Sequence, residues 1–524
     1  MSVSSAEERS ERVAPRILVV TPEVAFLPAG MGAGAEAVSV RAGTPADLVA
    51  ALIRVLDEMG ADVHVAVPNY RNLFRSRGAA AVGGSVARIG PIPRERVHLA
   101  QDRAFFYPTR LQAIPGFETV KISLAFQREV LNRIIPEVRP DVVHCFDWMT
   151  GLIPAMTREL GLPCLYTLTS LNTARLTLAA IEDRGIDAAA FWRNCYYGRM
   201  PAGYEETRES NPADILVSAV FAAHFVNTPG RAFLAELLAG GCPGVDPVLV
   251  AELAAKGRAG CLAAVDHAPD PSFDPALDGA LYRRFQAEDH AVAKPFNKLH
   301  LQERLGLPLD SKAPLFFWPT RLDGDRAGCR LALEAIGPLM KRFAADGLQL
   351  VFVADGDLHD VLRKIAADCG AQDRLAAAGF DPRLQRLAFG AADGVLLPIQ
   401  VSPCGLCCRI AQRYGALPVG YDAGGIRDAV THLDAGANKG NGFVFRHFDR
   451  TGLMWAVGEA MTFFALAPAV RTRQVKRIMA EARAGPDAFD TARHYIDLYG
   501  RMLNRPMTHL IKTPVEAEEA RSAA

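Results

Sequence analysis

Short apolar runs recur along the chain at wide intervals, and stretches with helical spacing separate them. The runs of strand length are "RILVV", "DVHVAV", "DVVHCF", "LPCLYTL", "DILVSA", "PLFFWPT", "LQLVFVAD", "GVLLPI" and "LPVGYD". After the first run, apolar side chains recur with the spacing of one helix face, at Leu48, Leu52, Val55, Leu56 and Met59. This alternation predicts parallel strands joined by helical crossovers, which is an α/β architecture.

The alternating pattern pauses once, over residues 266–280, where "DHAPDPSFDPALDGA" is rich in Pro, Asp and Gly and is typical of a linker. We therefore expect two Rossmann-like, doubly wound domains that face each other across a cleft. Helical spacing between 452 and 500 predicts long helices there. The expected boundaries are a disordered N-terminus over 1–15, an N-terminal domain over 16–265, a hinge over 266–285, a C-terminal domain over 286–505 and a tail over 506–524.

Composition and charge narrow the class of protein. The chain has 524 residues, half of them hydrophobic, and 58 Lys and Arg balance 58 Asp and Glu. A net charge of zero gives no reason to expect nucleic acid or an anionic membrane as a partner. The polar first fifteen residues do not resemble a secretory signal, and no window approaches the roughly 18 apolar residues that a membrane span needs. We expect a cytoplasmic protein.

The ten cysteines are scattered through the apolar runs and helices instead of forming a compact framework, which fits a reducing compartment. Cys404, Cys407 and Cys408 do lie close together, as the ligands of a metal or redox site would. The nearby residues offer no obvious fourth ligand for tetrahedral zinc. We therefore expect these thiols to serve in packing.

Ligands of doubly wound sheets bind beyond the carboxyl ends of the strands, so the residues that follow the strands are the candidates for a site. Arg321 and Arg326 follow "PLFFWPT", five residues apart across a Gly-containing turn. Two permanent cations beside a helix N-terminus are suited to holding a diphosphate and stabilising it as it leaves. Two solvated surface arginines are the simpler alternative, and the spacing alone does not separate the two interpretations.

Glycines follow two further strands. Gly405 and Leu406 stand at an expected helix start after "GVLLPI", where backbone N–H groups are able to bind a phosphate. Gly424 and Gly425 follow "LPVGYD" and permit close backbone approach to a ligand. Ordinary tight turns explain both patterns equally well.

Two strand ends in the N-terminal half carry further candidates. A long Gly- and Ala-rich loop follows the first strand, and a loop of this length is more often functional than inert. Arg41 is its one cation, and its glycines fit neither a GxGxxG nor a P-loop pattern. Asp147 and Trp148 follow "DVVHC". An Asp at that place is usually a helix N-cap, and a role in substrate binding is the alternative.

Taken together, these segments resemble the bacterial glycogen synthase and starch synthase family. The resemblance covers roughly residues 16–505, and its segments keep the family's order and spacing: "TPEVAFLP", "RAGTPADLVAAL", "HCFDWMTGLIPA", "APLFFWPTRLDGDRAG", "SPCGL", "RYGALPVGYDAGGIRDAV" and "NGFVF". It implies the GT-B fold, with an acceptor-side N-terminal domain and a nucleotide-sugar-binding C-terminal domain. It also implies retaining transfer of glucose from ADP-glucose to the non-reducing end of an α-1,4-glucan, without metal or cofactor. The sequence assigns no oligomeric state.

The resemblance implies roles for residues of the C-terminal half. Arg321 falls on the family's first phosphate-binding arginine, and Arg326 falls on the lysine of its Gln-Lys-Gly segment. The charge is kept at the second position, but a forked guanidinium replaces a compact ammonium group. Gly405 and Leu406 match the positions whose backbone contacts phosphate.

Four further positions match residues that bind substrate in the family. Gly424 and Gly425 match a glycine pair at the nucleotide-sugar site. Asp147 and Trp148 match the last two residues of the family's His-Asp-Trp or Asn-Asp-Trp segment. The resemblance therefore implies that these four residues line the substrate sites.

The first loop departs from the family pattern. Relatives read Lys-Thr-Gly-Gly or Lys-Ala-Gly-Gly where this chain has Arg41, then Ala, Gly43 and Thr44. Arg41 keeps the charge and Gly43 keeps the first glycine, so we expect both to bind substrate. Thr44 replaces the second glycine, and Pro45 follows it. Both residues restrict the conformation of a backbone that the family uses to close over the nucleotide sugar.

Three sugar-facing positions have changed as well. Ser402 replaces the glutamate of Glu-Pro-Cys-Gly-Leu, Thr169 replaces the histidine of Thr-Ile-His-Asn, and Phe146 replaces a polar residue before Asp147. A serine hydroxyl donates a hydrogen bond but supplies no charge. Removing one preorganised electrostatic group typically lowers the rate by about 10² to 10³. Two hypotheses remain open: a weakly active glucan synthase, or a catalytically inactive paralogue that binds nucleotide sugar or glucan and acts in regulation.

Overall fold

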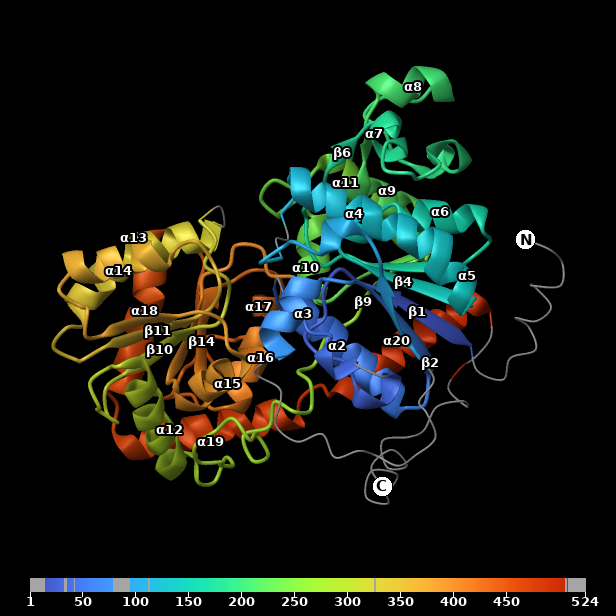
Figure 1. Cartoon of the computed structure of the whole chain (residues 1–524). Coiled ribbons are helices and arrows are strands. Elements are labelled where there is room, and N and C mark those ends of the chain that lie inside the picture. Colours follow the sequence, from blue (N-terminus) through green and yellow to red (C-terminus); the bar gives the residue numbers. More distant parts are fainter. Residues whose placement is uncertain are drawn as a thin grey trace. The chain divides into compact units, whose positions relative to one another are not determined.

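The computed structural model describes residues 15–32, 35–41, 43–78, 95–111, 114–324, 327–504 and 507. Their contacts divide the chain into two units (Figure 1). Unit 1 takes the described residues up to Pro229, those from Leu237 to Asp266, and those from Ala488 onward. Unit 2 takes Gly230–Glu236 and His267–Asp487. The N-terminus and tail for which we expect disorder and solvation lie almost wholly outside the described residues.

Unit 1 is built on a seven-stranded parallel sheet in the order β3-β2-β1-β4-β5-β8-β9. Its central strands are almost entirely buried, as expected for a parallel sheet that helices cover on both faces. The strand order reverses between β1 and β4. The strands are β1 (Arg16–Val20), β2 (Asp62–Pro68), β3 (Val97–Ala100), β4 (Val142–Phe146), β5 (Cys164–Thr167), β8 (Phe225–Thr228) and β9 (Leu262–Ala264).

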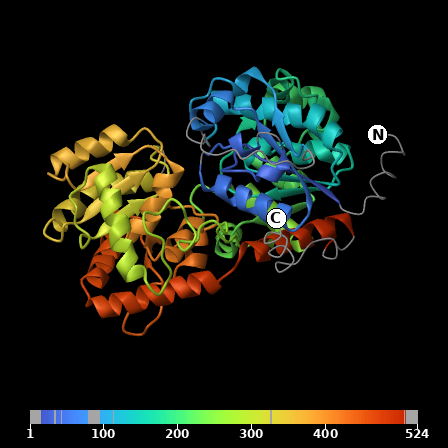
Figure 2. The same cartoon turned by 60° about the horizontal axis from the view of Figure 1, so that its bottom comes forward.

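Helices cover both faces of this sheet. In Figures 1 and 2, α2 and the red α20 lie together on one face, whereas α4, α6 and α9 lie on the other. The helices of unit 1 are α2 (Thr44–Glu58), α3 (Arg71–Gly78), α4 (Phe117–Glu129), α5 (Ile135–Val138), α6 (Ile153–Glu159), α7 (Leu178–Glu182), α8 (Tyr204–Ser210), α9 (Ile215–Ala222), α11 (Pro247–Arg258) and α20 (Ala488–Leu503). Most of α10 (Arg231–Leu238) belongs to unit 2, which takes Gly230–Glu236. A π-helical stretch (Val130–Ile134) joins α4 to α5, and a small antiparallel pair is formed by β6 (Arg175–Leu176) and β7 (Ala213–Asp214).

A buried polar network fastens the C-terminal helix α20 to the unit 1 sheet. The Tyr499 hydroxyl lies 2.7 Å from Nδ1 of His144 on β4. The other ring nitrogen of His144 lies 2.7 Å from the Thr167 hydroxyl, which in turn donates to Asn227. Asn227 donates to the Tyr495 hydroxyl over 2.9 Å. Because these groups are buried together, each satisfies polar atoms that would otherwise be unpaired.

Unit 2 repeats the architecture with a six-stranded parallel sheet in the order β12-β11-β10-β13-β14-β15. The strand order reverses between β10 and β13. The strands are β10 (Leu315–Trp318), β11 (Gln349–Val353), β12 (Leu375–Ala378), β13 (Gly394–Leu397), β14 (Leu417–Tyr421) and β15 (Phe443–Phe445). In such a doubly wound sheet, helices that join strands on one side of the reversal lie on one face, and those on the other side lie on the opposite face.

In unit 2, α13 and α14 lie with α18 on one face of the sheet, and α15 and α16 lie with α12 and α19 on the other (Figure 1). The helices are α12 (His290–Leu305), α13 (Ala327–Arg342), α14 (His359–Asp368), α15 (Pro382–Ala391), α16 (Leu406–Arg413), α17 (Gly424–Ala429), α18 (Arg450–Phe464) and α19 (Pro468–Ala484). No single helix in the described ranges is long and apolar enough to cross a membrane; α18 joined to Pro468–Leu503 meets that test only across a 115° bend.

Most of the predicted helices and strands are present, and one prediction is wrong. "DILVSA" was expected as a strand but forms the start of α9, because the Asp214 carboxylate accepts a hydrogen bond from the Val217 N–H at 3.0 Å and caps a helix. A continuous apolar run does not distinguish a buried strand from a buried helix. The helix predicted over 48–59 is α2, and the long helices predicted over 452–500 are α18, α19 and α20.

The predicted linker has no helix or strand, but it packs against unit 2. Residues 265–289 contain neither element. Phe273 and Asp278 are buried, and Arg386 of α15 donates to the carbonyl oxygen of Ser272 at 2.7 Å. The Tyr414 hydroxyl also donates to Asp278. The role of hinge that we assign to this segment stays a prediction.

Candidate functional site

Each sheet has one point at which the strand order reverses, and in doubly wound folds ligands bind beyond the carboxyl ends of the strands at such a point. In unit 2 the reversal lies between β10 and β13. Arg321 follows β10, and the turn Ser402–Leu406 follows β13. Unit 2 therefore brings the phosphate-side and sugar-side candidates of the sequence to neighbouring strand ends.

Arg321 is held in place from both sides. Its guanidinium makes two hydrogen bonds to the Asp323 carboxylate, of 2.8 and 3.1 Å. The Leu322 N–H donates to the carbonyl oxygen of Asp355 at the end of β11. A Cβ at Gly356, where φ is +155°, would overlap the backbone of Leu322, so only glycine allows the two loops to approach this closely. The side chain of Arg321 is thus preorganised at the strand end.

Arg326, the second predicted cation, lies outside the described residues. The structure therefore places only the first member of the expected pair. The turn before it is fixed by the Gly324 N–H, which donates to the Asp357 carboxylate at 3.0 Å. The helix that follows, α13, begins at Ala327.

The glycines predicted to approach a ligand lie against each other, and their contact with a ligand stays a prediction. The Gly425 N–H donates to the Ser402 carbonyl oxygen over 2.6 Å. A Cβ at Gly424 would overlap that same oxygen, and a Cβ at Gly405 would overlap the carbonyl oxygen of Gly425. Gly405 and Gly424 have φ values of +59° and +50°, which favour glycine. We call Ser402–Gly405 together with Gly424–Gly425 the glycine interlock.

The glycine interlock fixes the start of α16. Gly405 is the N-cap in a left-handed conformation, and Leu406 is the first helical residue. The first N–H groups of a helix have no partner within the helix, so they are available to an anion that reaches this end. Ser402 is 7% exposed. Ser402, which we predict to replace the glutamate of the family, precedes this helix start by four residues.

A carboxylate that sequence reasoning missed is bound to the glycine interlock. The N–H of Gly424 donates to Oε2 of Glu236 over 2.9 Å. The other oxygen of Glu236 lies 2.7 Å from the Arg427 guanidinium. Arg427 also bonds Asp422, at the end of β14, over 3.0 Å. Glu236 belongs to α10, so a helix from the N-terminal half of the sequence contributes an acidic side chain to unit 2.

The start of α10 is anchored to the same loop. Both oxygens of the Asp428 carboxylate accept from the Ala232 N–H, at 2.9 and 3.1 Å. A Cβ at Gly230 would lie 2.5 Å from the Pro403 carbonyl oxygen, so glycine is needed where α10 meets the turn. Nothing around position 236 in the sequence signals this contact, since it joins residues that are 188 positions apart.

In unit 1 the strand order reverses between β1 and β4. Glu23 follows β1, and its carboxylate accepts from the Gly43 N–H at 3.0 Å. Arg41 forms an ion pair with Asp47 in the first turn of α2 and donates to the Gly43 carbonyl oxygen. Pro45 occupies the first turn of that helix, where proline is favoured. Arg41 and Gly43 are therefore fixed at the strand end by two carboxylates.

Asp147, at the end of β4, is a strained and buried acid. Its φ is +71°, which is uncommon for a residue other than glycine. Burial raises the pKa of its carboxyl group to about 6, although the Met149 N–H and the Ser170 hydroxyl donate to it. Trp148 is 1% exposed, so its indole packs within unit 1. Such strain at a strand end is often found at functional sites.

Three hydroxyl groups near Asp147 are buried, and no partner for them exists among the described residues. They belong to Tyr70, Tyr166 and Thr169. The charge of Asp147 is one of the causes that raise the pKa of both tyrosines, after burial itself. Thr169 stands next to Ser170, the donor to Asp147. Unpaired buried hydroxyls are costly, and they are expected where a ligand or water supplies the missing partner.

The three clustered cysteines are buried packing groups. Cys404, Cys407 and Cys408 are each at most 8% exposed. Burial raises the pKa of the Cys408 thiol well above its ordinary value, which disfavours the thiolate that binds a metal. Within the described ranges no group of three or more His, Cys, Asp or Glu is arranged to hold a metal ion.

The family profile and the curated relatives both match the glycogen synthase and starch synthase family. The family profile of the starch synthase catalytic domain matches residues 16–249. Glycogen synthase 2 of Geobacter metallireducens is 29% identical over 488 residues, which is 86% of this chain and 92% of that protein. The glycogen synthase of Rhodospirillum rubrum is 31% identical over 380 residues, covering 70% of this chain and 71% of that protein.

Among solved structures, the catalytic domain of starch synthase IV from Arabidopsis thaliana, bound to ADP and acarbose, superposes with a TM-score of 0.73. The match covers 94% of this chain and all of that one, at 21% identity, and so establishes the fold. The two Rossmann-like units are those of the GT-B glycosyltransferases, as the sequence predicted. The chain belongs to the bacterial glycogen synthase and starch synthase family of glucosyltransferases.

Proposed function

We propose that this protein transfers glucose from ADP-glucose to the non-reducing end of an α-1,4-glucan, with retention at the anomeric carbon. Family membership supports the reaction class, and the relative bound to ADP and acarbose supports the donor and the acceptor. Arg321 and the start of α16 follow neighbouring strands of unit 2, which supports a role for both in holding the departing diphosphate. The ten cysteines, none of which forms a disulfide in the described structure, support a reducing, cytoplasmic setting.

The observation that carries this proposal is the carboxylate of Glu236. Retaining transfer builds positive charge on the sugar ring, which a nearby carboxylate stabilises. Ser402 supplies no charge. Glu236 is bound to Gly424, whose neighbour Gly425 is bound to the Ser402 carbonyl oxygen, so its negative charge is anchored on the same interlock. We propose that Glu236 supplies part of the charge that the family draws from the residue at 402.

The expected rate is low. Arg427 shares the charge of Glu236 through the 2.7 Å ion pair, which weakens its effect on the sugar. Thr169 also replaces the histidine of the family. Losses within one catalytic unit do not add simply, but each missing electrostatic group typically lowers the rate by about 10² to 10³. No metal is needed in this scheme, so chelation with EDTA should leave transfer unchanged.

The test measures transfer of radiolabelled glucose from ADP-glucose to glycogen by four proteins: wild type, Ser402→Glu, Glu236→Gln and the double variant. We expect slow transfer by the wild type, at least tenfold faster transfer by Ser402→Glu, and about 10²-fold slower transfer by Glu236→Gln. Ser402→Glu should rescue Glu236→Gln, because either position then supplies the carboxylate.

Asp428→Asn serves as the matched control, because Asp428 also ties α10 to the interlock loop but has no proposed charge role. If Glu236→Gln and Asp428→Asn lose transfer equally and Ser402→Glu rescues neither, Glu236 has only a structural role. A wild type that transfers glucose from another sugar nucleotide, but not from ADP-glucose, would correct the donor and leave the reaction class standing.

A second candidate is a catalytically inactive protein that binds nucleotide sugar or glucan and acts in regulation. The observation that favours it is the joint change of the sugar-facing positions, with Ser402 and Thr169 both buried and uncharged. Retained binding of ADP-glucose with no transfer by the wild type or by Ser402→Glu would establish this function instead.

A further inference from the structure

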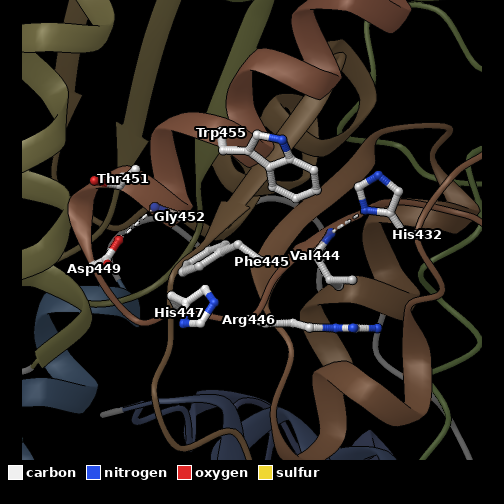
Figure 3. A pocket seen from close by; sticks show the side chains of 9 residues that line it. All are labelled: His432, Val444, Phe445, Arg446, His447, Asp449, Thr451, Gly452 and Trp455. Carbon is white, nitrogen blue, oxygen red and sulfur yellow. Dashed lines mark hydrogen bonds between the residues drawn. The ribbon is translucent and has the colours of Figure 1, made fainter.

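A cavity of about 440 Å³ opens in unit 2 where β15 ends and α18 begins. Its volume lies within the range of small-molecule sites, about 300 to 1,000 Å³. Figure 3 shows that the side chains of Phe445, Trp455 and His432 line it together with the more polar residues Arg446, His447 and Asp449. Of these residues, only Arg446 is linked to the donor side, through its ion pair with Asp422.

Trp455 and His432 form an aromatic wall on this cavity. The indole of Trp455 is 49% exposed, whereas Trp148 and Trp318 are almost completely buried. The His432 imidazole lies parallel to it, with ring centroids 5.3 Å apart and planes inclined by 19°. A large apolar ring held half in solvent by a stacked partner is a ready surface for the flat face of a ligand.

The histidine of this wall is also a defined hydrogen-bond donor. The Val444 N–H donates to Nδ1 of His432 over 3.3 Å, so the proton of the neutral ring resides on Nε2. Phe443 lies edge-on against the same imidazole, 5.7 Å away, and fixes its orientation. His432 therefore offers both a ring face and an oriented N–H group.

The polar side of the cavity consists of side chains held by hydrogen bonds and ion pairs, with charges of both signs. Asp449 caps α18 by accepting from the Gly452 N–H at 2.7 Å. A Cβ at Gly452 would overlap the His447 carbonyl oxygen, so glycine is required for this wall. Arg446 is 84% exposed and pairs with Asp422 at 3.5 Å. Among the lining residues one guanidinium, that of Arg446, is balanced by one carboxylate, that of Asp449, and this favours a neutral ligand with hydroxyl groups over a polyanion.

We propose that this cavity is a second binding site for an α-1,4-glucan chain, in which a glucose ring stacks on Trp455 while its hydroxyls bond His432 and the charged rim. This rests on the proposed function for the identity of the sugar. A pyranose ring presents an apolar face and hydroxyl edges, which match the aromatic wall and the polar rim. The site would hold the polymer to unit 2 apart from the reacting end of the chain.

The test measures binding of glycogen and of maltoheptaose to the full-length protein by affinity electrophoresis and tryptophan fluorescence. We expect maltoheptaose to change the emission of the wild type, and Trp455→Ala to abolish that change. The same variant should weaken glycogen binding at least tenfold and raise KM for glycogen, with KM for ADP-glucose unchanged. Trp455→Phe, which keeps a ring, should retain most of the binding.

Tyr282→Ala is the matched control. Tyr282 is 64% exposed, belongs to unit 2, and is stacked on His300 with centroids 4.9 Å apart, but it lies outside the cavity. Equal loss of binding in both variants, or normal binding by Trp455→Ala, overturns the proposal. So does an emission change produced by ADP and not by maltoheptaose, since that assigns the wall to a nucleotide.

These outcomes separate the proposal from the proposed function. If the protein transfers glucose but binds glycogen equally well with and without Trp455, only the proposal of the second site is overturned. Trp455-dependent glycogen binding in a protein that transfers no glucose overturns the enzyme and leaves the second site standing.

Discussion

The two points of strand reversal are built on the same topology but differ in how their polar groups are satisfied. In unit 2, Arg321 is paired with Asp323, and Glu236 is paired with Arg427 and with the Gly424 N–H. In unit 1, Asp147 is strained and carries a raised pKa, and hydroxyls such as that of Tyr70 have no partner among the described residues. The groups named at the unit 2 edge are paired, whereas three hydroxyls at the unit 1 edge have no partner among the described residues. In unit 2 the corresponding unpaired atom is Nε of Arg409 in α16.

We propose that the difference reflects what each edge binds, a diphosphate in unit 2 and a sugar chain in unit 1. A diphosphate needs donors that are already in position, because reorganising charges during the reaction is costly. The partners around Arg321 supply that preorganisation. A sugar chain instead brings many hydroxyls, and unpaired groups such as Thr169 are left for them to satisfy. Four substitutions would break or sharpen this contrast.

The largest effect is expected from Gly405→Ala. A Cβ there would overlap the Gly425 carbonyl oxygen at a φ of +59°, so the glycine interlock must open. We expect the free energy of unfolding to fall by about 3 kcal/mol or more and ADP-glucose binding to be lost. Gly337→Ala in α13 is the control, because the added Cβ would lie 3.9 Å from the Ile365 side chain, an ordinary van der Waals contact. Chemical denaturation that finds the two variants equally stable would contradict the interlock.

Asp147→Asn should give the next largest effect, and only at neutral pH. Burial raises the pKa of Asp147 to about 6, above the value of about 3.9 expected in the unfolded chain. Its contribution to stability is therefore full below about pH 4 and is lost as pH rises through about 6, by about 3 kcal/mol in all.

Asparagine tolerates a positive φ and keeps an acceptor for the Met149 N–H. We expect thermal unfolding of Asp147→Asn to occur at a higher temperature than that of the wild type at pH 8, and at a similar temperature at pH 4. An identical pH dependence in the two proteins would show that the carboxyl group is not strained by its burial.

The smallest effects should come from a pair of buried tyrosines in unit 1. Tyr499→Phe removes the hydroxyl bonded to His144 and should cost about 1 to 3 kcal/mol. Tyr70→Phe removes a hydroxyl that has no partner and should leave stability unchanged or slightly higher, while weakening glucan binding. Urea unfolding of both variants checks this, and a similar loss in both would mean that the Tyr70 hydroxyl is satisfied after all.

The sequence predicts the central strands of both sheets because they are clear apolar runs. The outer strands β3, β8, β9, β12 and β15 are not among the predicted runs. The strand-end positions of Arg321, Gly405 and Gly424 follow from the same pattern. The helix α9 was mistaken for a strand because its cap, Asp214, acts through a single hydrogen bond that an apolar run does not reveal. The sequence does not predict a role for Glu236, because that role depends on a contact with Gly424, 188 positions away.

The way in which the chain threads its two units has a consequence for its synthesis. The strand β4 emerges early, yet its His144 finds the Tyr499 hydroxyl only when α20 has been made. Unit 1 is thus begun first and finished last, with all of the main body of unit 2 translated in between. A ribosome stalled near residue 487 would display a sheet whose buried polar network lacks both tyrosines of α20, which makes such a nascent chain a natural client for chaperones.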